Sequence, residues 1–139
     1  MKRMLLLLLI VLSFPVLCMG ESAIQSEGNM SYIITSEGAV IIDWNNQLPD
    51  VLDATLYVPP TLGGIPVVGI GFDAFDTCNE GPSTQFQLIL PEGITFLEKG
   101  AFQCCNQATV ISLPSTLETI PEGSFIHVKA KIVFPNENP

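Results

Sequence analysis

Residues 88–105 read LILPEGITFLEKGAFQCC, and residues 111–128 read ISLPSTLETIPEGSFIHV. Both stretches begin with two alternating apolar residues and a proline, continue with a second apolar pair, and reach a small residue followed by phenylalanine. The prolines of the two stretches are 23 residues apart, and so are the phenylalanines. A repeat of this period indicates stacked structural units, because one unit of this size cannot bury its apolar side chains alone.

The pattern continues on both sides of these two units. An earlier copy covers residues 58–78, and the start of a later copy is found at residues 132–135. In the earlier copy Phe75 precedes Phe102 by 27 residues, because residues 80–83 form a four-residue insertion. The chain therefore contains about three units and the beginning of a fourth.

Each unit is predicted to contribute one short strand that ends at its proline. Alternate residues of a strand point to the same face, and proline cannot donate a hydrogen bond to a neighbouring strand. The second apolar pair turns the chain back, and the phenylalanine enters the centre. Stacked units then form a ladder of parallel strands over one continuous core. The expected core residues are Phe75, Phe102, Phe125, Leu90, Leu113, Phe134, Leu97 and Ile120.

This pattern resembles the BspA-like leucine-rich repeats, also called the Treponema pallidum type. Their unit of about 23 residues ends in an Ala-Phe-x-x-Cys element, which residues 74–78 and 101–105 match. The third unit departs from the pattern, since Val128 stands where cysteine is usual. The resemblance covers residues 30–135. It implies a repeat solenoid, a short right-handed superhelix built mostly of short β-strands with helical turns.

The resemblance also implies an N-terminal β-hairpin cap before the repeats. Residues 32–34 and 39–42 are apolar, and the Glu37-Gly38 pair between them is typical of a hairpin turn. The predicted organisation is a signal peptide at 1–20, a flexible leader at 21–29, the cap at 30–56, about three repeats at 57–135 and a tail at 136–139.

The first twenty residues have the pattern of a secretory signal peptide. Two basic residues precede an apolar run that is too short to span a bilayer, which takes about 20 apolar residues. Small residues near the boundary predict cleavage between Gly20 and Glu21, and hence a secreted or cell-surface protein with no stable membrane insertion after cleavage. In the alternative, an acylated Cys18 anchors a lipoprotein, although Leu17 before it is larger than such a site usually has.

The charge of the chain excludes some classes of partner. The 139 residues include 14 acidic and 5 basic ones, a formal charge of −9, and residues 1–20 hold two of the basic residues and none of the acidic ones, so cleavage leaves −11. Phosphates of nucleic acids and anionic membranes would repel such a chain. The charge also opposes self-assembly, so we expect a monomer whose partner is an extracellular protein. Lys129 and Lys131 flank the last predicted strand and are expected to guard its edge.

Patterns for catalysis, cofactors and metals are weak. His127 is the single histidine, so a Ser-His-Asp or Cys-His arrangement would depend on it, and it falls in a variable turn of the repeat. Residues 69–74 fit a loose dinucleotide-binding motif but lack the βαβ unit that gives the motif its meaning. The acidic residues between 43 and 53 do not form a calcium-binding loop. We therefore expect no enzymatic activity, no cofactor and no metal.

Cys78 and Cys105 occupy equivalent positions in adjacent units. One interpretation is that both are small buried apolar residues. The other is a disulfide, since secretion implies an oxidising compartment and equivalent positions on neighbouring strands lie about 5 Å apart. In either case an odd thiol remains, and Cys104 is the expected one.

Two functional hypotheses follow from the sequence. The first is a non-catalytic protein-binding or adhesion module, because the proteins that the sequence resembles are associated with adhesion and protein contact. This inference rests on analogy of fold. The alternative is a structural remnant or self-associating fragment of a longer repeat array, with no independent ligand. A hydrolase has no candidate machinery in this sequence.

Overall fold

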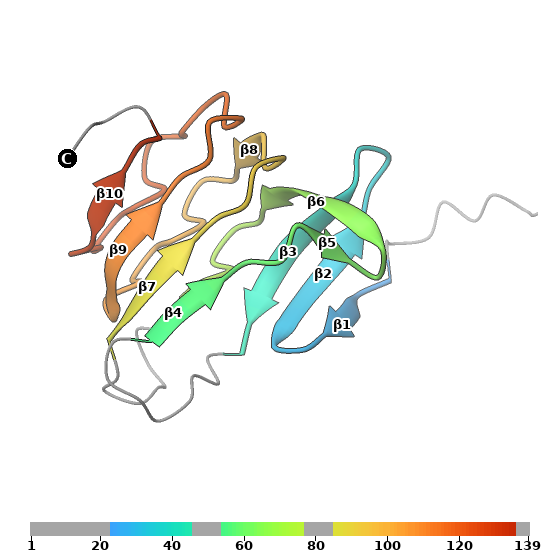
Figure 1. Cartoon of the computed structure of the whole chain (residues 1–139), viewed down its shortest axis with the longest axis horizontal. Coiled ribbons are helices and arrows are strands. Elements are labelled where there is room, and N and C mark those ends of the chain that lie inside the picture. The colour runs from blue at the N-terminus through green and yellow to red at the C-terminus, as the bar shows by residue number, and fades with distance from the viewer. Residues whose placement is uncertain (1–22, 46–53, 77–84, 136–139) are drawn as a thin grey trace, which may run out of the picture.

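A computed structural model describes residues 23–45, 54–76 and 85–135 (Figure 1). The segments between strands, expected to include helical turns, are non-helical in this part of the chain, and none of it forms a helix that could cross a membrane. The strands are β1 Gln25–Glu27, β2 Met30–Ile34, β3 Ala39–Trp44, β4 Ala54–Tyr57, β5 Thr61–Leu62, β6 Ile65–Ile70, β7 Phe86–Ile89, β8 Phe96–Leu97, β9 Ala108–Ser112 and β10 Lys131–Val133.

The N-terminal strands form an antiparallel cap. β2 and β3 pair as the hairpin expected from the sequence, and Thr35 donates hydrogen bonds from its backbone N–H and its hydroxyl to the Gly38 carbonyl. Residues 21–29 are expected to form a flexible leader, whereas β1 lies within that range and pairs with β2. The side chains of β1 are all exposed. No alternation of apolar residues therefore signals this strand, and its backbone pairing alone holds it to the hairpin.

Four strands form a parallel sheet in the order β10-β9-β7-β4. The register aligns Leu56, Leu88, Ile111 and Ile132, one residue from each strand. The two central members are fully buried, and the two outer members are partly buried against the core. The ladder begins with β4, so the repeat array starts inside the segment 30–56 that the sequence assigns to the cap.

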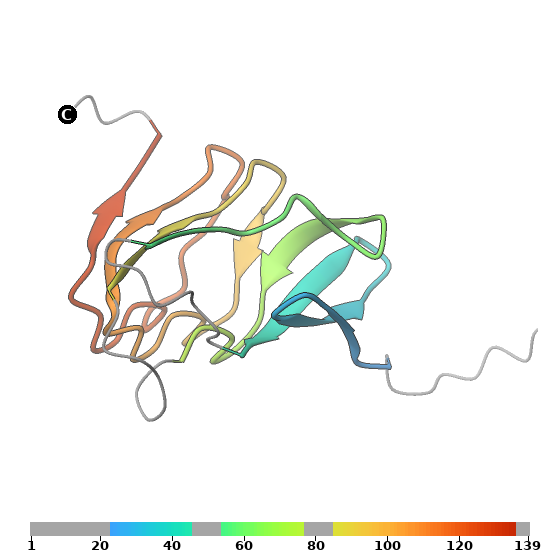
Figure 2. The same ribbon diagram turned by 60° about the horizontal axis from the view of Figure 1, so that its bottom comes forward.

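A second line of parallel pairing joins the cap to the repeats. β3 pairs with β6, and β6 pairs with β8. Phe96 of β8 then forms a bridge with Thr119 of the next unit. Each repeat is therefore hydrogen-bonded to its neighbours along two separate strand segments, and Figure 2 shows the successive units following one another from the cap to β10.

The turns that carry the phenylalanines form a third line of contacts. The backbone N–H groups of Phe75 and Phe102 each donate to the carbonyl of the residue before the next unit's phenylalanine, at 3.3 and 3.0 Å. Trp44 of the cap does the same toward the residue before Phe75, at 2.9 Å. Trp44 thus takes the place of a phenylalanine in a unit preceding the first.

The aromatic rings follow this line through the core. Ring centroids are 5.7 Å apart for Trp44 and Phe75, 5.4 Å for Phe75 and Phe102, and 5.3 Å for Phe102 and Phe125. The last pair is almost parallel, with an interplanar angle of 4°. Such distances lie in the range of favourable aromatic pairs, so one column of rings, which we call the aromatic column, runs from the cap to the third unit.

The residue two positions before each phenylalanine has a left-handed backbone. The φ angles are +58° at Asp73, +79° at Gly100 and +87° at Gly123. Glycine adopts this region without steric cost, and among other residues Asp is one of the few that visits it. The turn geometry of the repeat therefore explains both glycines and leaves Asp73 as the strained member of the series.

The last unit differs from the expected core. Phe125 is half-buried at the end of the aromatic column, whereas Ile120 and Phe134, both expected in the core, are each 40% exposed. Ile120 lies in the third unit and Phe134 in the beginning of the fourth, and no further described unit stacks on them, so their outer sides stay at the surface. The expected core residues that are buried are Phe75, Phe102, Leu90, Leu97 and Leu113.

Several predictions from the sequence fall outside the described residues. These are the signal peptide, the cleavage site between Gly20 and Glu21, the tail at 136–139 and Cys78. Cys105 is fully buried. Cleavage and the disulfide between Cys78 and Cys105 stay predictions.

Candidate functional site

The outward side of the parallel sheet is formed by the residues that alternate with the buried row. Two rows of aligned residues run across the four strands, and all eight of their side chains are exposed or half-buried. We call this surface the strand face. Its members are Thr55, Gln87, Val110 and Lys131 in one row, and Tyr57, Ile89, Ser112 and Val133 in the other.

The strand face differs in charge from the rest of the molecule. None of its eight residues is acidic, although the chain has 14 acidic residues, and Lys131 is its one charged side chain. Tyr57 is 67% exposed on it. Centres of protein interfaces are depleted in charged residues and enriched in tyrosine. This surface therefore has the composition of an interface in a chain that is otherwise strongly acidic.

Backbone hydrogen bonds hold the strand face in a fixed shape. Just beyond the strands, the N–H groups of Val58, Leu90 and Leu113 donate to carbonyls of the following strand at 3.0, 3.1 and 2.9 Å. The Thr109 hydroxyl adds a bond of 3.1 Å to the Phe86 carbonyl between β9 and β7. A face fixed in this way loses little conformational entropy when a partner binds.

Glu92 connects two repeats at the side of the sheet. Its carboxylate accepts hydrogen bonds from the Ser115 backbone N–H at 3.0 Å, the Ser115 hydroxyl at 2.8 Å and the Thr116 backbone N–H at 3.2 Å. These donors, the Ser115 backbone first, hold the pKa of Glu92 below its usual value because they stabilise the charged form. This carboxylate therefore has a structural role.

Asp73 has the opposite environment. Burial, and secondarily the neighbouring Asp76 carboxylate, raises the pKa of Asp73. Its Oδ1 atom is buried and has no hydrogen-bond partner among the described residues. A raised pKa is compatible with acid chemistry, but no described cluster of three His, Cys, Asp or Glu residues could hold a metal ion.

His127 and Cys104 are brought together by the repeat. They occupy equivalent turn positions of adjacent units, with φ angles of +59° and +58°. Both line a surface hollow of about 640 Å³ together with Asn106, Val128 and Lys129. The Cys104 thiol and the His127 imidazole therefore share one open hollow with the Asn106 amide.

The glycines of the loose dinucleotide motif have packing roles. A Cβ atom at Gly69 would overlap the Phe96 ring of the next unit, and one at Gly71 would lie 3.0 Å from the Ile41 carbonyl oxygen. Close approach between neighbouring units therefore requires both glycines. Of the acidic residues considered for calcium, Asp43 is exposed on β3, and the others lie at 50 and 53, outside the described residues.

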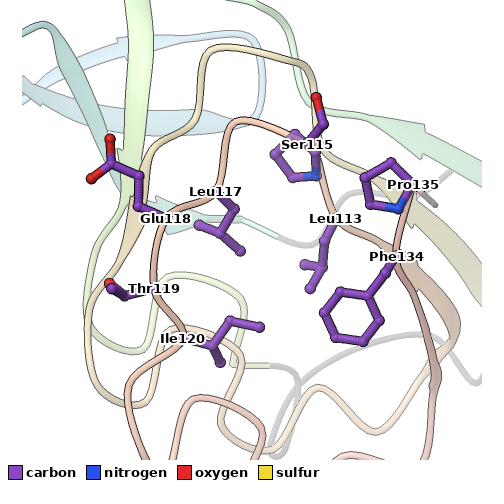
Figure 3. A pocket seen from close by; sticks show the side chains of 9 residues that line it. Leu113, Ser115, Leu117, Glu118, Thr119, Ile120, Phe134 and Pro135 are labelled. Carbon is purple, nitrogen blue, oxygen red and sulfur yellow. The ribbon is translucent and has the colours of Figure 1, made fainter. Parts of the chain in front are cut away.

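A second surface lies at the C-terminal end of the array. It is a hollow of about 410 Å³ between the last strand and the second apolar pair of the third unit. Figure 3 shows Ile120 and Leu117 on one side of it, and Phe134 and Leu113 on the other. We call it the end hollow. Its lining residues are Leu113, Pro114, Ser115, Leu117, Glu118, Thr119, Ile120, Phe134 and Pro135.

Two crystal structures have a similar fold. A leucine-rich cell surface protein from Faecalibacterium prausnitzii superposes with a TM-score of 0.60 and 17% identity, over 83% of this chain and 33% of that chain. A leucine-rich repeat protein from Bacteroides capillosus superposes with a TM-score of 0.55 and 18% identity, over 82% of this chain and 99% of that one. The chain has a leucine-rich repeat fold.

These comparisons establish the fold alone. This leucine-rich repeat chain spans about a third of the length of the Faecalibacterium protein. No protein-family model matches the sequence, and no curated protein matches it either.

Sequence reasoning did not single out the strand face or Tyr57. The signal was present, because the strand face consists of the residues that alternate with the apolar row, and the repeat register aligns them. Their burial and their common lack of acidic charge become visible only when the four strands are placed side by side.

Proposed function

We propose that the chain is a non-catalytic protein-binding module, secreted or held at the cell surface, and that its strand face binds an extracellular protein. The observation that carries the proposal is a surface without acidic residues and with an exposed tyrosine in a chain of net charge −9. In this proposal the repeats are of the BspA-like type and coil as a right-handed solenoid, and binding serves adhesion.

The location of the Faecalibacterium protein at the cell surface supports the proposed compartment. The strand face supports the proposed activity. Acidic residues elsewhere on the molecule repel other acidic surfaces, whereas the strand face presents hydrogen-bonding groups and apolar area without a charge to desolvate, apart from Lys131. Tyr57 supplies the large amphipathic side chain that often dominates binding energy at an interface.

The binding experiment uses the exported protein and a panel of immobilised fibronectin, laminin, collagen and mucin. We expect saturable binding to at least one of them, and we expect Tyr57→Ala to weaken that binding at least tenfold, as loss of an interface hot spot does. The matched control is Phe72→Ala. Phe72 is an aromatic residue of comparable exposure, 59% against 67%, that lies outside the strand face.

Equal effects of the two substitutions would contradict a role for the strand face. Binding that persists unchanged in Tyr57→Ala would do the same. Unfolding midpoints of both variants show whether either change acts through stability, and retention of the parent midpoint makes the binding comparison interpretable.

Export is tested separately from binding. Mass spectrometry of secreted material is expected to find Glu21 as the first residue. A diacylglyceryl mass on Cys18 would instead establish the lipoprotein form, in which the same module is anchored to a membrane.

The alternative function is a self-associating fragment of a longer array. Exposure of Ile120 and Phe134 at the last unit is the observation that favours it. Light scattering over a concentration series distinguishes the two, since a protein-binding monomer keeps its mass at micromolar concentration and a self-associating fragment does not.

A further inference from the structure

The C-terminal end of the array presents a strand edge. Among the described residues β10 pairs with β9 alone and is the outermost strand of its sheet. Along the ladder the N–H groups of Val58, Leu90 and Leu113 each donate to the following strand. Phe134 is the next member of this series, and its N–H has no acceptor among the described residues. An exposed edge of this kind is a template for a further strand.

The end hollow lies beside this edge and is apolar. Inside the array the residues equivalent to Phe134 and Ile120 are Leu113 and Leu97, with exposures of 5% and 3%. The unit that follows covers those residues. Among the described residues no unit covers Phe134 and Ile120, which are 40% exposed, so the end hollow has the shape and chemistry of a contact between neighbouring repeats.

Charge indicates what kind of segment fits the edge. Lys131 lies on β10 in register with Val110 of β9, and Lys129 is exposed just before it. A strand added in the same register would place one side chain directly beside Lys131, where an acidic residue is favoured over a basic one. A second copy of this chain is a poorer occupant, because pairing of two β10 edges would bring the lysines of both copies to one interface.

We propose that this end binds an extended segment of a partner protein as a fifth strand, parallel to β10. The segment has an acidic residue beside Lys131, an apolar residue next to Ile132, and a second apolar residue that enters the end hollow. Strand addition of this type takes affinity from main-chain hydrogen bonds and specificity from alternate side chains. The surface is separate from most of the strand face, and it goes beyond the function proposed above.

The probe is a synthetic peptide with the sequence of residues 107–116 carrying V110E. This sequence copies the strand that β10 itself pairs with, and the glutamate falls at the position beside Lys131. A second peptide carries V110K instead. A third carries V110E with S112P, which removes the backbone N–H that would face β10 in this register. Binding to the exported protein is measured by fluorescence anisotropy.

We expect the V110E peptide to bind, the V110K peptide to bind about two- to fivefold more weakly, and the S112P peptide to bind at least tenfold more weakly. Lys131→Glu in the protein is expected to reverse the preference between the first two peptides. A general loss of structure in the Lys131→Glu variant would weaken binding of both peptides and would not reverse the preference between them.

The end hollow is tested by Ile120→Asp, which is expected to weaken binding of the V110E peptide at least tenfold. The matched control is Ile34→Asp at the hairpin of the cap, because Ile34 is 36% exposed and Ile120 is 40% exposed. The control is expected to bind as the parent does, and unfolding midpoints verify that both variants are folded.

Three results would overturn the proposal. They are equal binding of the V110E and V110K peptides, equal loss in the two aspartate variants, and a stable dimer of the protein alone that Ile120→Asp dissociates. The last result would assign this end to a second copy of the chain. Binding of extracellular proteins through Tyr57 is measured independently, so these outcomes leave the test of the strand face intact.

Discussion

The two ends of the repeat array are closed to different degrees. At the N-terminal end Trp44 packs against Phe75 and is 3% exposed, and the cap strand β3 pairs with β6. At the C-terminal end Phe125 is half-buried, and Ile120 and Phe134 are 40% exposed. Large apolar side chains are thus buried in the core at the N-terminal end and exposed at the surface at the C-terminal end. The number of neighbouring units, rather than the residue type, decides the burial of each side chain.

The largest expected effect comes from the middle of the aromatic column. Phe102 is fully buried between two rings. Phe102→Ala should therefore lower the free energy of unfolding by about 3–5 kcal/mol, as for other buried aromatic residues. Urea unfolding measures the loss. Phe102→Leu keeps more of the volume and should lose less, so it provides a folded comparison if the alanine variant does not fold. A loss under about 1 kcal/mol in the alanine variant would contradict the proposed stacking.

A comparison of the two ends of the column sharpens the contrast. Trp44→Ala should cost about 3–5 kcal/mol, because it removes a buried ring that the cap places over Phe75. Phe125→Ala should cost only about 1–2 kcal/mol, since the ring is half-buried and stacks on one neighbour. The measurement is again urea unfolding. Equal losses at the two ends would show that the C-terminal end is covered as well as the N-terminal one.

Asp73→Gly should stabilise the protein by about 1 kcal/mol, since glycine adopts the left-handed backbone at no steric cost. The pKa of Asp73 is raised above its ordinary value of 3.8, so the folded state holds this proton more tightly than the unfolded state. The contribution of Asp73 to stability is therefore present below pH 3.8 and is lost as pH rises through the raised pKa.

The gain from Asp73→Gly should consequently be larger at pH 7 than at pH 3. Thermal unfolding at the two pH values measures it. Gly100→Asp is the reciprocal change at the equivalent position of the next unit and should destabilise, because it introduces the same strain there. A variant at Asp73 that is less stable than the parent at pH 7 would contradict this interpretation.

The smallest expected effect concerns Glu92, whose pKa is lowered by the hydrogen bonds from Ser115 and Thr116. A lowered pKa in the folded state means that the stabilisation is present above the ordinary value of 4.5 and is lost as pH falls through the lowered pKa. Glu92→Gln should therefore unfold at a slightly lower temperature than the parent at pH 7, and the difference should vanish in acid. A difference that is independent of pH would assign the effect to packing rather than charge.

Much of the repeat could be predicted from the sequence. The alignment of Leu88, Ile111 and Ile132 follows from the 23-residue pattern and its prolines, and the strand register bears it out. The three phenylalanines follow from the same alignment, and they stack as neighbours. Part of the candidate site could be predicted from the same alignment, because the strand face consists of the residues that alternate with these positions.

Other features depend on contacts that no local pattern records. Trp44 joins the aromatic column through a hydrogen bond to Ala74, 30 residues further along the chain. β1 is polar and short, and only its pairing with β2 makes it a strand. The spacing of His127 and Cys104 reveals that they are equivalent, but their shared hollow depends on how the two turns stack.

The sequence by itself determined which residues are equivalent, because apolar residues, prolines and glycines recur at the same positions of each repeat. The tertiary structure decided which of those equivalent residues are buried. Leu97 and Ile120 occupy the same place in their units, yet one is 3% and the other 40% exposed. A side chain is buried only when neighbouring units pack against it on both sides. The spacing of the repeat does not show whether a further unit packs against a given residue.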